Sequence, residues 1–172
     1  MRRIVEVPSI REPVRPSPGF AKKGLADFKL DLLGLCGFGC RYCSSNHGNY
    51  LRINHKRFAE HAQQQLGEPL TPADDPTLTY VWPDILDRLR AQLDRRPSTW
   101  GRGKTLVFSM LTDAFSPWLV QQGITKAALE LLVERTSFRI RILTKNAIVA
   151  HEDWTRYFMT LRDRLIVGRS AR

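Results

Sequence analysis

The sequence predicts an α/β fold built on a parallel sheet, and three observations support this prediction. The chain has 172 residues, of which 42% are hydrophobic and 26% charged, which is typical of one globular domain with a buried core. Strand-like apolar stretches alternate with stretches of helical spacing, a pattern that favours parallel strands joined by right-handed crossovers. Polar residues follow several of these strands directly, at the edge where functional groups gather in α/β barrels.

The first 26 residues are rich in proline and basic side chains, so we expect an extended N-terminal arm over residues 1–26 and a core over residues 27–172. The first core strand is expected over residues 28–35, where partial alternation runs into an apolar stretch, with the cysteine-containing loop at its C-terminal end. Gly37 and Gly39 follow it and would let the next loop turn tightly.

The remaining elements follow from apolar spacing. Ile85, Leu86, Leu89 and Leu93 recur at helical spacing after Pro83. Helices are also predicted over residues 55–66 and 152–161 and after Gly123, where the expected buried stripe is Ile124, Ala127, Ala128, Leu131 and Leu132. Strands are predicted over residues 105–110 and 138–143, and a fourth begins at residues 165–167.

The charge of the chain bears on its partners and its location. The formal net charge is +10, which favours polyanions and makes nucleic acid or a phosphorylated small molecule a candidate partner. No apolar run is long enough for a transmembrane helix, so we expect no membrane partner. The N-terminus has no apolar core of a signal peptide, which predicts a cytoplasmic protein.

The three cysteines, Cys36, Cys40 and Cys43, all lie within the segment CGFGCRYC. Such close spacing in a cytosolic chain indicates a metal site rather than a disulfide framework. With His47 they could complete a tetrahedral zinc site in a nucleic-acid-binding module. Alternatively, the three thiolates could hold a [4Fe-4S] cluster and leave one iron open for a substrate or cofactor.

The C-x3-C-x2-C spacing, with Tyr42 before the last cysteine, resembles the signature of the radical S-adenosylmethionine (SAM) superfamily. The segments SMLTDAF and ILTKNA, after the second and third predicted strands, resemble the spore photoproduct lyase-like family over about residues 27–172. The resemblance implies a partial parallel (β/α) barrel of the radical SAM type. With about four strands in this chain, it would be a truncated member, and an inactive fragment is a further alternative.

The resemblance also implies the chemistry. Cys36, Cys40 and Cys43 would ligate a [4Fe-4S] cluster that cleaves SAM reductively, and the resulting 5′-deoxyadenosyl radical would take hydrogen from an unknown substrate. An electron donor of the flavodoxin or ferredoxin type is implied as partner. Family members that repair DNA use an additional cysteine as hydrogen-atom donor, and this sequence has no fourth cysteine. Lyase-like chemistry on thymine dimers is therefore not carried over.

Five residues are implied as SAM contacts. Thr112 and Asp113 would receive the amino group of SAM, Lys145 its carboxylate, and Ser170 its methionyl or ribose part, while Tyr42 would lie near the adenine. An acid and a base would thus meet the two opposite charges of one ligand through charge-assisted hydrogen bonds. The alternatives are a turn-capping role for Asp113 and a solvated strand-end role for Lys145.

Overall fold

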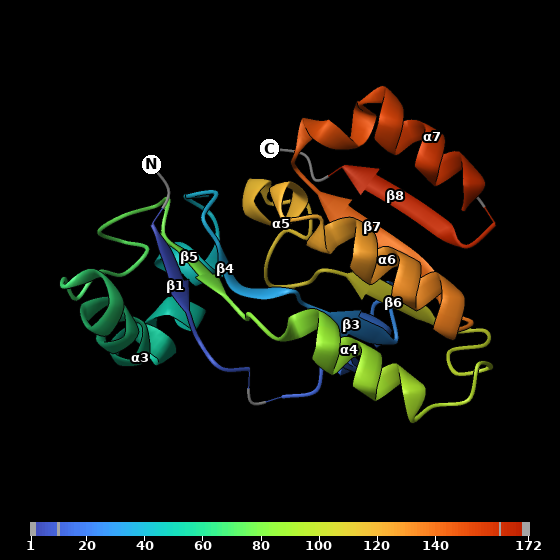
Figure 1. Ribbon diagram of the computed structural model, residues 1–172, viewed down its shortest axis with the longest axis horizontal. Coiled ribbons are helices and arrows are strands. Elements are labelled where there is room, and N and C mark those ends of the chain that lie inside the picture. Colours follow the sequence, from blue (N-terminus) through green and yellow to red (C-terminus); the bar gives the residue numbers. More distant parts are fainter. Residues whose placement is uncertain (1–2, 10, 162, 170–172) are drawn as a thin grey trace. The chain divides into compact units, whose positions relative to one another are not determined.

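The chain folds as two compact units, each made of two stretches of sequence. The first comprises Met1–Ile10 and Leu33–Asp84, and the second comprises Arg11–Leu32 and Ile85–Arg172. Each unit has its own sheet (Figure 1). The structure is a computed structural model that describes residues 3–9, 11–161 and 163–169.

The first unit is a three-stranded sheet in the order β1-β5-β4, covered by helix α3. Strand β1 runs parallel to β5, and β4 runs antiparallel to it. Phe58 of α3 packs on Tyr80 of β5, whose hydroxyl donates a 2.6 Å hydrogen bond to the Phe58 carbonyl. The elements of this unit are β1 (Ile4–Glu6), β4 (Leu33–Cys36), α2 (Ser44–His47), α3 (Asn49–Leu66) and β5 (Thr79–Val81).

The second unit is a five-stranded sheet in the order β2-β3-β6-β7-β8. Strands β3, β6, β7 and β8 are mutually parallel, and β2 pairs antiparallel with β3 at one edge. The parallel strands coincide with the regions in which four strands were predicted. The strands of the described residues close no barrel, and the radical SAM type of barrel stays a prediction. The strands are β2 (Val14–Pro16), β3 (Phe28–Leu30), β6 (Thr105–Phe108), β7 (Arg139–Thr144) and β8 (Leu165–Arg169).

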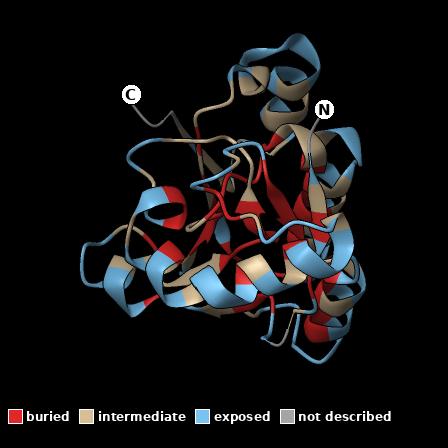
Figure 2. Cartoon of the chain, turned by 90° about the vertical axis from the view of Figure 1, so that its left-hand side faces the viewer, coloured by how far each residue is buried: buried red, intermediate tan, exposed pale blue. Residues whose placement is uncertain are grey.

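Helices α4 and α6 pack against each other and lie over the strands of the second unit in Figure 1. Figure 2 shows that buried residues concentrate in the strands, whereas exposed residues lie on the outward faces of the helices. In the described part of the chain no helix has the length and apolar character that crossing a membrane requires. The helices of this unit are α1 (Pro18–Ala21), α4 (Ile85–Asp94), α5 (Pro117–Gln121), α6 (Ile124–Arg135), the 3-10 helix η1 (Ala147–Ala150) and α7 (Glu152–Thr160).

The stretch 28–35, predicted as one strand, forms two strands in different sheets. Strand β3 ends at Leu30 and β4 begins at Leu33. Between them Asp31 is almost fully buried, and its Oδ1 accepts hydrogen bonds from the backbone N–H groups of Met110 and Leu111. The prediction of a single strand was wrong because apolar residues in a row do not reveal which of two sheets each one enters.

The segment expected as an N-terminal arm contributes β1 to the first sheet and β2 to the second. Pro16 is tolerated in β2 because this is an edge strand, where a missing N–H breaks no ladder. The free side of β2 is covered by Gln92 of α4, whose side-chain amide accepts from the Val14 N–H and donates to the Val14 carbonyl, both at 2.8 Å. Such covering protects an exposed sheet edge.

Two predicted helices differ from the observed ones in extent or in their buried face. Helix α3 begins at Asn49 rather than residue 55, because Leu51 lies on the same buried stripe as Phe58. In α6 the fully buried residues are Thr125, Ala128, Leu129 and Leu132, so the stripe is rotated from the predicted one. Thr125 enters the core because its hydroxyl donates to the Ala114 carbonyl at 2.6 Å.

Replacing Arg164 by methionine should destabilise the second unit by about 2 kcal/mol, because buried carbonyl groups would lose charged donors. The Arg164 guanidinium donates to the carbonyls of Val133 (2.7 Å) and Phe138 (2.9 Å). Urea unfolding followed by circular dichroism would measure the change. As a control, Arg156→Met removes an exposed arginine paired with Glu152 and should cost less than about 0.5 kcal/mol. Equal losses of unfolding free energy in the two variants would show that the hydrogen bonds of Arg164 do not stabilise the second unit.

Candidate functional site

The cysteine loop leaves the carboxyl end of β4 in the first unit. Cys36 is the last residue of that strand and lies opposite Thr79 of β5. Gly37 has a φ of +62°, and a Cβ there would lie 2.3 Å from the Thr79 hydroxyl oxygen. Gly39 has a φ of +63°, and its Cβ would lie 2.8 Å from Pro76. The predicted tight turn is therefore confirmed, since a side chain at either position would clash.

The second half of the loop turns into helix α2. The Cys43 N–H donates to the Cys40 carbonyl at 3.1 Å, and the Cys43 carbonyl accepts from the N–H groups of Asn46 and His47 at 3.0 Å each. Tyr42 stands between the two cysteines with 70% of its surface exposed. The three cysteines are partly accessible, and none of them is in a disulfide. A ligand could therefore reach both the thiols and an aromatic ring.

The three thiols are not gathered around a common centre. Across the described ranges no three His, Cys, Asp or Glu side chains form a group that could hold a metal ion. This applies equally to the three-cysteine set and to the set with His47. The donor chemistry fits an iron–sulfur cluster, because thiolates are its usual ligands.

A cavity of about 420 Å³ lies beside this loop. Its lining includes Gly39 and Arg41 of the loop, His47 of α2, and Pro72 and Pro76. Its volume is within the range of small-molecule sites, roughly 300–1,000 Å³. The loop thus has space for a ligand next to its turn.

The other predicted contacts lie in the second unit, where Asp113 joins two loops at the carboxyl ends of β6 and β7. Its Oδ1 accepts from the Phe115 N–H at 2.9 Å and from the Thr144 hydroxyl at 2.8 Å. Its Oδ2 accepts from the Lys145 N–H at 3.0 Å. These three donors use most of the four acceptor positions of a carboxylate. Asp113 therefore caps its own turn and also fastens the neighbouring loop.

The side-chain hydroxyl groups of Thr112 and of two serines close to it in the sequence form no hydrogen bond that the structure describes. Thr112 Oγ1, Ser109 Oγ and Ser116 Oγ are buried without a hydrogen-bond partner among the residues that the structure describes. Buried hydroxyl groups normally have partners. These atoms therefore fit a role for Thr112 in holding a polar ligand.

Asp31 is a residue of this edge that the sequence analysis did not single out. Its Oδ1 holds the loop after β6, with N–H···O distances of 2.9 Å from Met110 and 2.7 Å from Leu111. Its Oδ2 is buried and has no partner within the described chain. The available signal was one acidic residue interrupting the apolar run LDLLGL. Asp31 and Asp113 thus act alike, each fastening the exit loop of the next strand.

The predicted residues therefore fall into two groups, one in each unit. The structure brings Asp113 and the backbone of Lys145 together after β6 and β7, with Thr112 next to Asp113 in the chain, but the expectation that the cysteine loop follows a strand of the same sheet was wrong, because that loop follows β4 of the other sheet. Cys36, Cys40, Cys43 and Tyr42 share the loop of the first unit. Ser170 lies outside the described residues.

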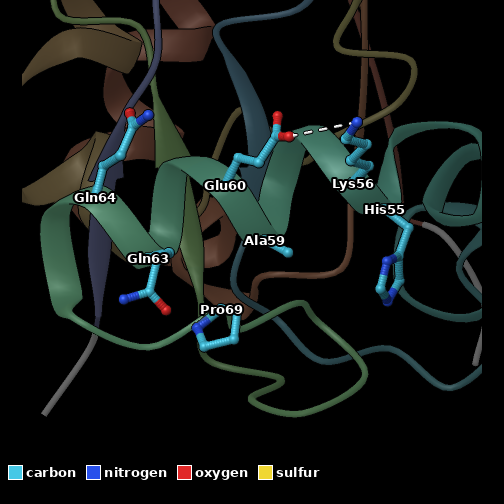
Figure 3. Close-up of a pocket in the computed structure, with 7 residues that line it drawn as sticks. All are labelled: His55, Lys56, Ala59, Glu60, Gln63, Gln64 and Pro69. Carbon is cyan, nitrogen blue, oxygen red and sulfur yellow. Dashed lines mark ion pairs between the residues drawn. The ribbon is translucent and has the colours of Figure 1, made fainter.

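A further hollow of about 460 Å³ runs along the exposed side of α3 (Figure 3). Lys56 and Glu60 stand above it and form an ion pair of 3.8 Å, while Ala59 and Pro69 line it with small apolar surfaces. Because the two charges compensate each other, this hollow favours no charged ligand.

Comparison of the chain with protein-family models, with curated proteins and with solved structures finds no match.

Proposed function

We propose that this protein is a radical SAM enzyme. The observation that carries the proposal is the segment CGFGCRYC, which places three cysteines on one glycine-shaped loop at the carboxyl end of a strand. The thiols are not in disulfides, and a cavity adjoins the loop. The parallel sheet of the second unit, with polar groups at its carboxyl edge, adds support.

In this proposal Cys36, Cys40 and Cys43 hold a [4Fe-4S] cluster through their thiolates, and Tyr42 lies near the adenine of SAM. When bound, the cluster and SAM supply reductive cleavage of the sulfonium and removal of a hydrogen atom from a substrate. The electron would come from a protein donor of the flavodoxin or ferredoxin type.

The family resemblance assigns the remaining contacts of SAM to Thr112, Asp113, Lys145 and Ser170. Thr112 has an unused buried hydroxyl that can bond the amino group, and Lys145 can meet the carboxylate with its ammonium. Asp113 would act mainly by holding the backbone of Lys145 in place, because its oxygens already accept from the Lys145 N–H, the Thr144 hydroxyl and the Phe115 N–H.

Anaerobic reconstitution with iron and sulfide tests the proposal directly. We expect about four iron and four sulfide per chain, broad visible absorbance, and formation of 5′-deoxyadenosine from SAM after reduction. A chain that binds one zinc, takes up no sulfide and loses the metal in His47→Ala would instead support the zinc-binding nucleic-acid module. Cluster uptake without cleavage of SAM would identify an inactive fragment.

A further inference from the structure

A cavity of about 540 Å³ lies beside the edge strand of the second unit. It adjoins the amino end of β3 at Phe28 and the segment before β6 at Trp100. The residues of the proposed SAM site in this unit follow the carboxyl ends of the strands. The cavity lies along the edge strand β2, and none of its lining residues belongs to that site.

The cavity has an excess of positive charge. Arg11, Arg15 and Arg96 line it, and Glu12 is its one carboxylate. Glu12 already accepts from Arg95, just after α4, at 2.9 Å and from the Gln92 amide at 2.7 Å, and it forms an ion pair of 4.0 Å with Arg96. It therefore compensates only part of the charge.

A lysine, Lys29, adds a further positive charge close to these arginines. Lys29 lies directly opposite Arg15 in the β2–β3 pair. The pKa of Lys29 is lowered mainly by burial; the charge of Asp31 opposes this shift, and the weaker effects of Arg15 and Arg11 add to it. Binding an anion would relieve this repulsion.

The cavity also has groups suited to both parts of a phosphorylated nucleoside. Arg15 Nε is buried and has no hydrogen-bond partner in the described part of the chain. The planar guanidinium is well matched to phosphate. The Arg96 guanidinium lies 5.1 Å from the centre of the Trp100 ring, and Val14 and Pro16 add apolar wall. Aromatic and guanidinium planes are surfaces on which a base can stack.

We propose that this cavity binds a nucleoside phosphate, with the phosphates on Arg11 and Arg15 and the base against Trp100 and Arg96. The cavity volume suits one small ligand of this kind. The same chemistry is present in a free nucleotide and in a single-stranded nucleic acid, and the test separates these two sources.

Calorimetric titration of the whole chain with ADP tests this site. We expect Arg15→Gln to weaken ADP binding about tenfold or more, since a charged donor to phosphate is lost. Arg90→Gln is the matched control, because Arg90 is an exposed arginine of α4 paired with Asp87; it should leave the affinity unchanged. Arg96→Gln should also weaken binding, and melting temperatures should show that each variant is folded.

Two further ligands define the outcome. Pyrophosphate should bind more weakly than ADP, because it lacks a base. A short single-stranded oligonucleotide is the second ligand. If it binds more tightly than ADP, and Arg15→Gln also weakens its binding, the natural ligand of the cavity is a nucleic-acid strand rather than a free nucleotide. Absence of binding by both ADP and the oligonucleotide, equal binding of pyrophosphate and ADP, or equal effects of Arg15→Gln and Arg90→Gln would each overturn the proposal.

Discussion

Replacing any one of Cys36, Cys40 and Cys43 by alanine is expected to abolish both cluster binding and cleavage of SAM. A [4Fe-4S] cluster with three protein ligands depends on every one of them, and alanine offers no donor atom. Iron and sulfide content after anaerobic reconstitution measures the first effect. The yield of 5′-deoxyadenosine, which should fall to the level without protein, measures the second.

The control for these variants is His47→Ala, because His47 lies on α2 immediately after the same loop. It should keep its iron, sulfide and 5′-deoxyadenosine formation. Circular dichroism should show that all four variants are folded, since none of these residues is fully buried. Cleavage of SAM that survives in any cysteine variant would contradict the assignment of that cysteine.

The second large effect is expected from Asp113→Asn, which should lower the free energy of unfolding by about 2 kcal/mol or more. Asparagine has nearly the same volume, but its NH2 group cannot accept a hydrogen bond. Either the Phe115 N–H or the Lys145 N–H would then face another donor. Urea unfolding of the apo chain measures this loss without any contribution from SAM.

Two comparisons show whether the loss of stability comes from the hydrogen bonds of Asp113 or from the removal of a negative charge. Asp153→Asn removes a carboxylate that is 84% exposed on α7 and should change stability by less than about 0.5 kcal/mol. In a double-mutant cycle, Asp113→Asn and Thr144→Val should be non-additive, because the two side chains bond each other at 2.8 Å. Additive losses, or equal losses in the two Asp→Asn variants, would rule out the proposed fastening role.

Local patterns in the sequence were sufficient to predict most strands and helices of the second unit. Residues 138–143 alternate strictly, and the structure has β7 at Arg139–Thr144. The apolar stretch 105–110 contains β6, and the spacing of Ile85, Leu89 and Leu93 marks the buried face of α4. These elements were predictable because the periodicity of each one reports which side faces the core.

The candidate site was predictable in its residue types but less so in its geometry. The motif itself identified the cysteine loop, and positive φ angles at Gly37 and Gly39 agree with the expected tight turn. The position of Asp113 after a strand was also expected. The Phe115 N–H bond agrees with the turn-capping alternative, but the bonds from Thr144 and Lys145 could not be foreseen, because these residues are 31 and 32 positions away in the sequence. Asp31 was missed for the same reason.

By itself, the sequence determined the alternation of strands and helices, the cluster of three cysteines and the positive charge. Only the tertiary structure decided that residues 28–35 divide between two sheets, that Asp31 and Asp113 fasten neighbouring loops, and that basic and aromatic side chains surround a cavity beside β2. The physical reason is that the periodicity of apolar residues shows which side of its own helix or strand each side chain lies on. Sheet membership and side-chain partners depend instead on contacts between residues far apart in the chain.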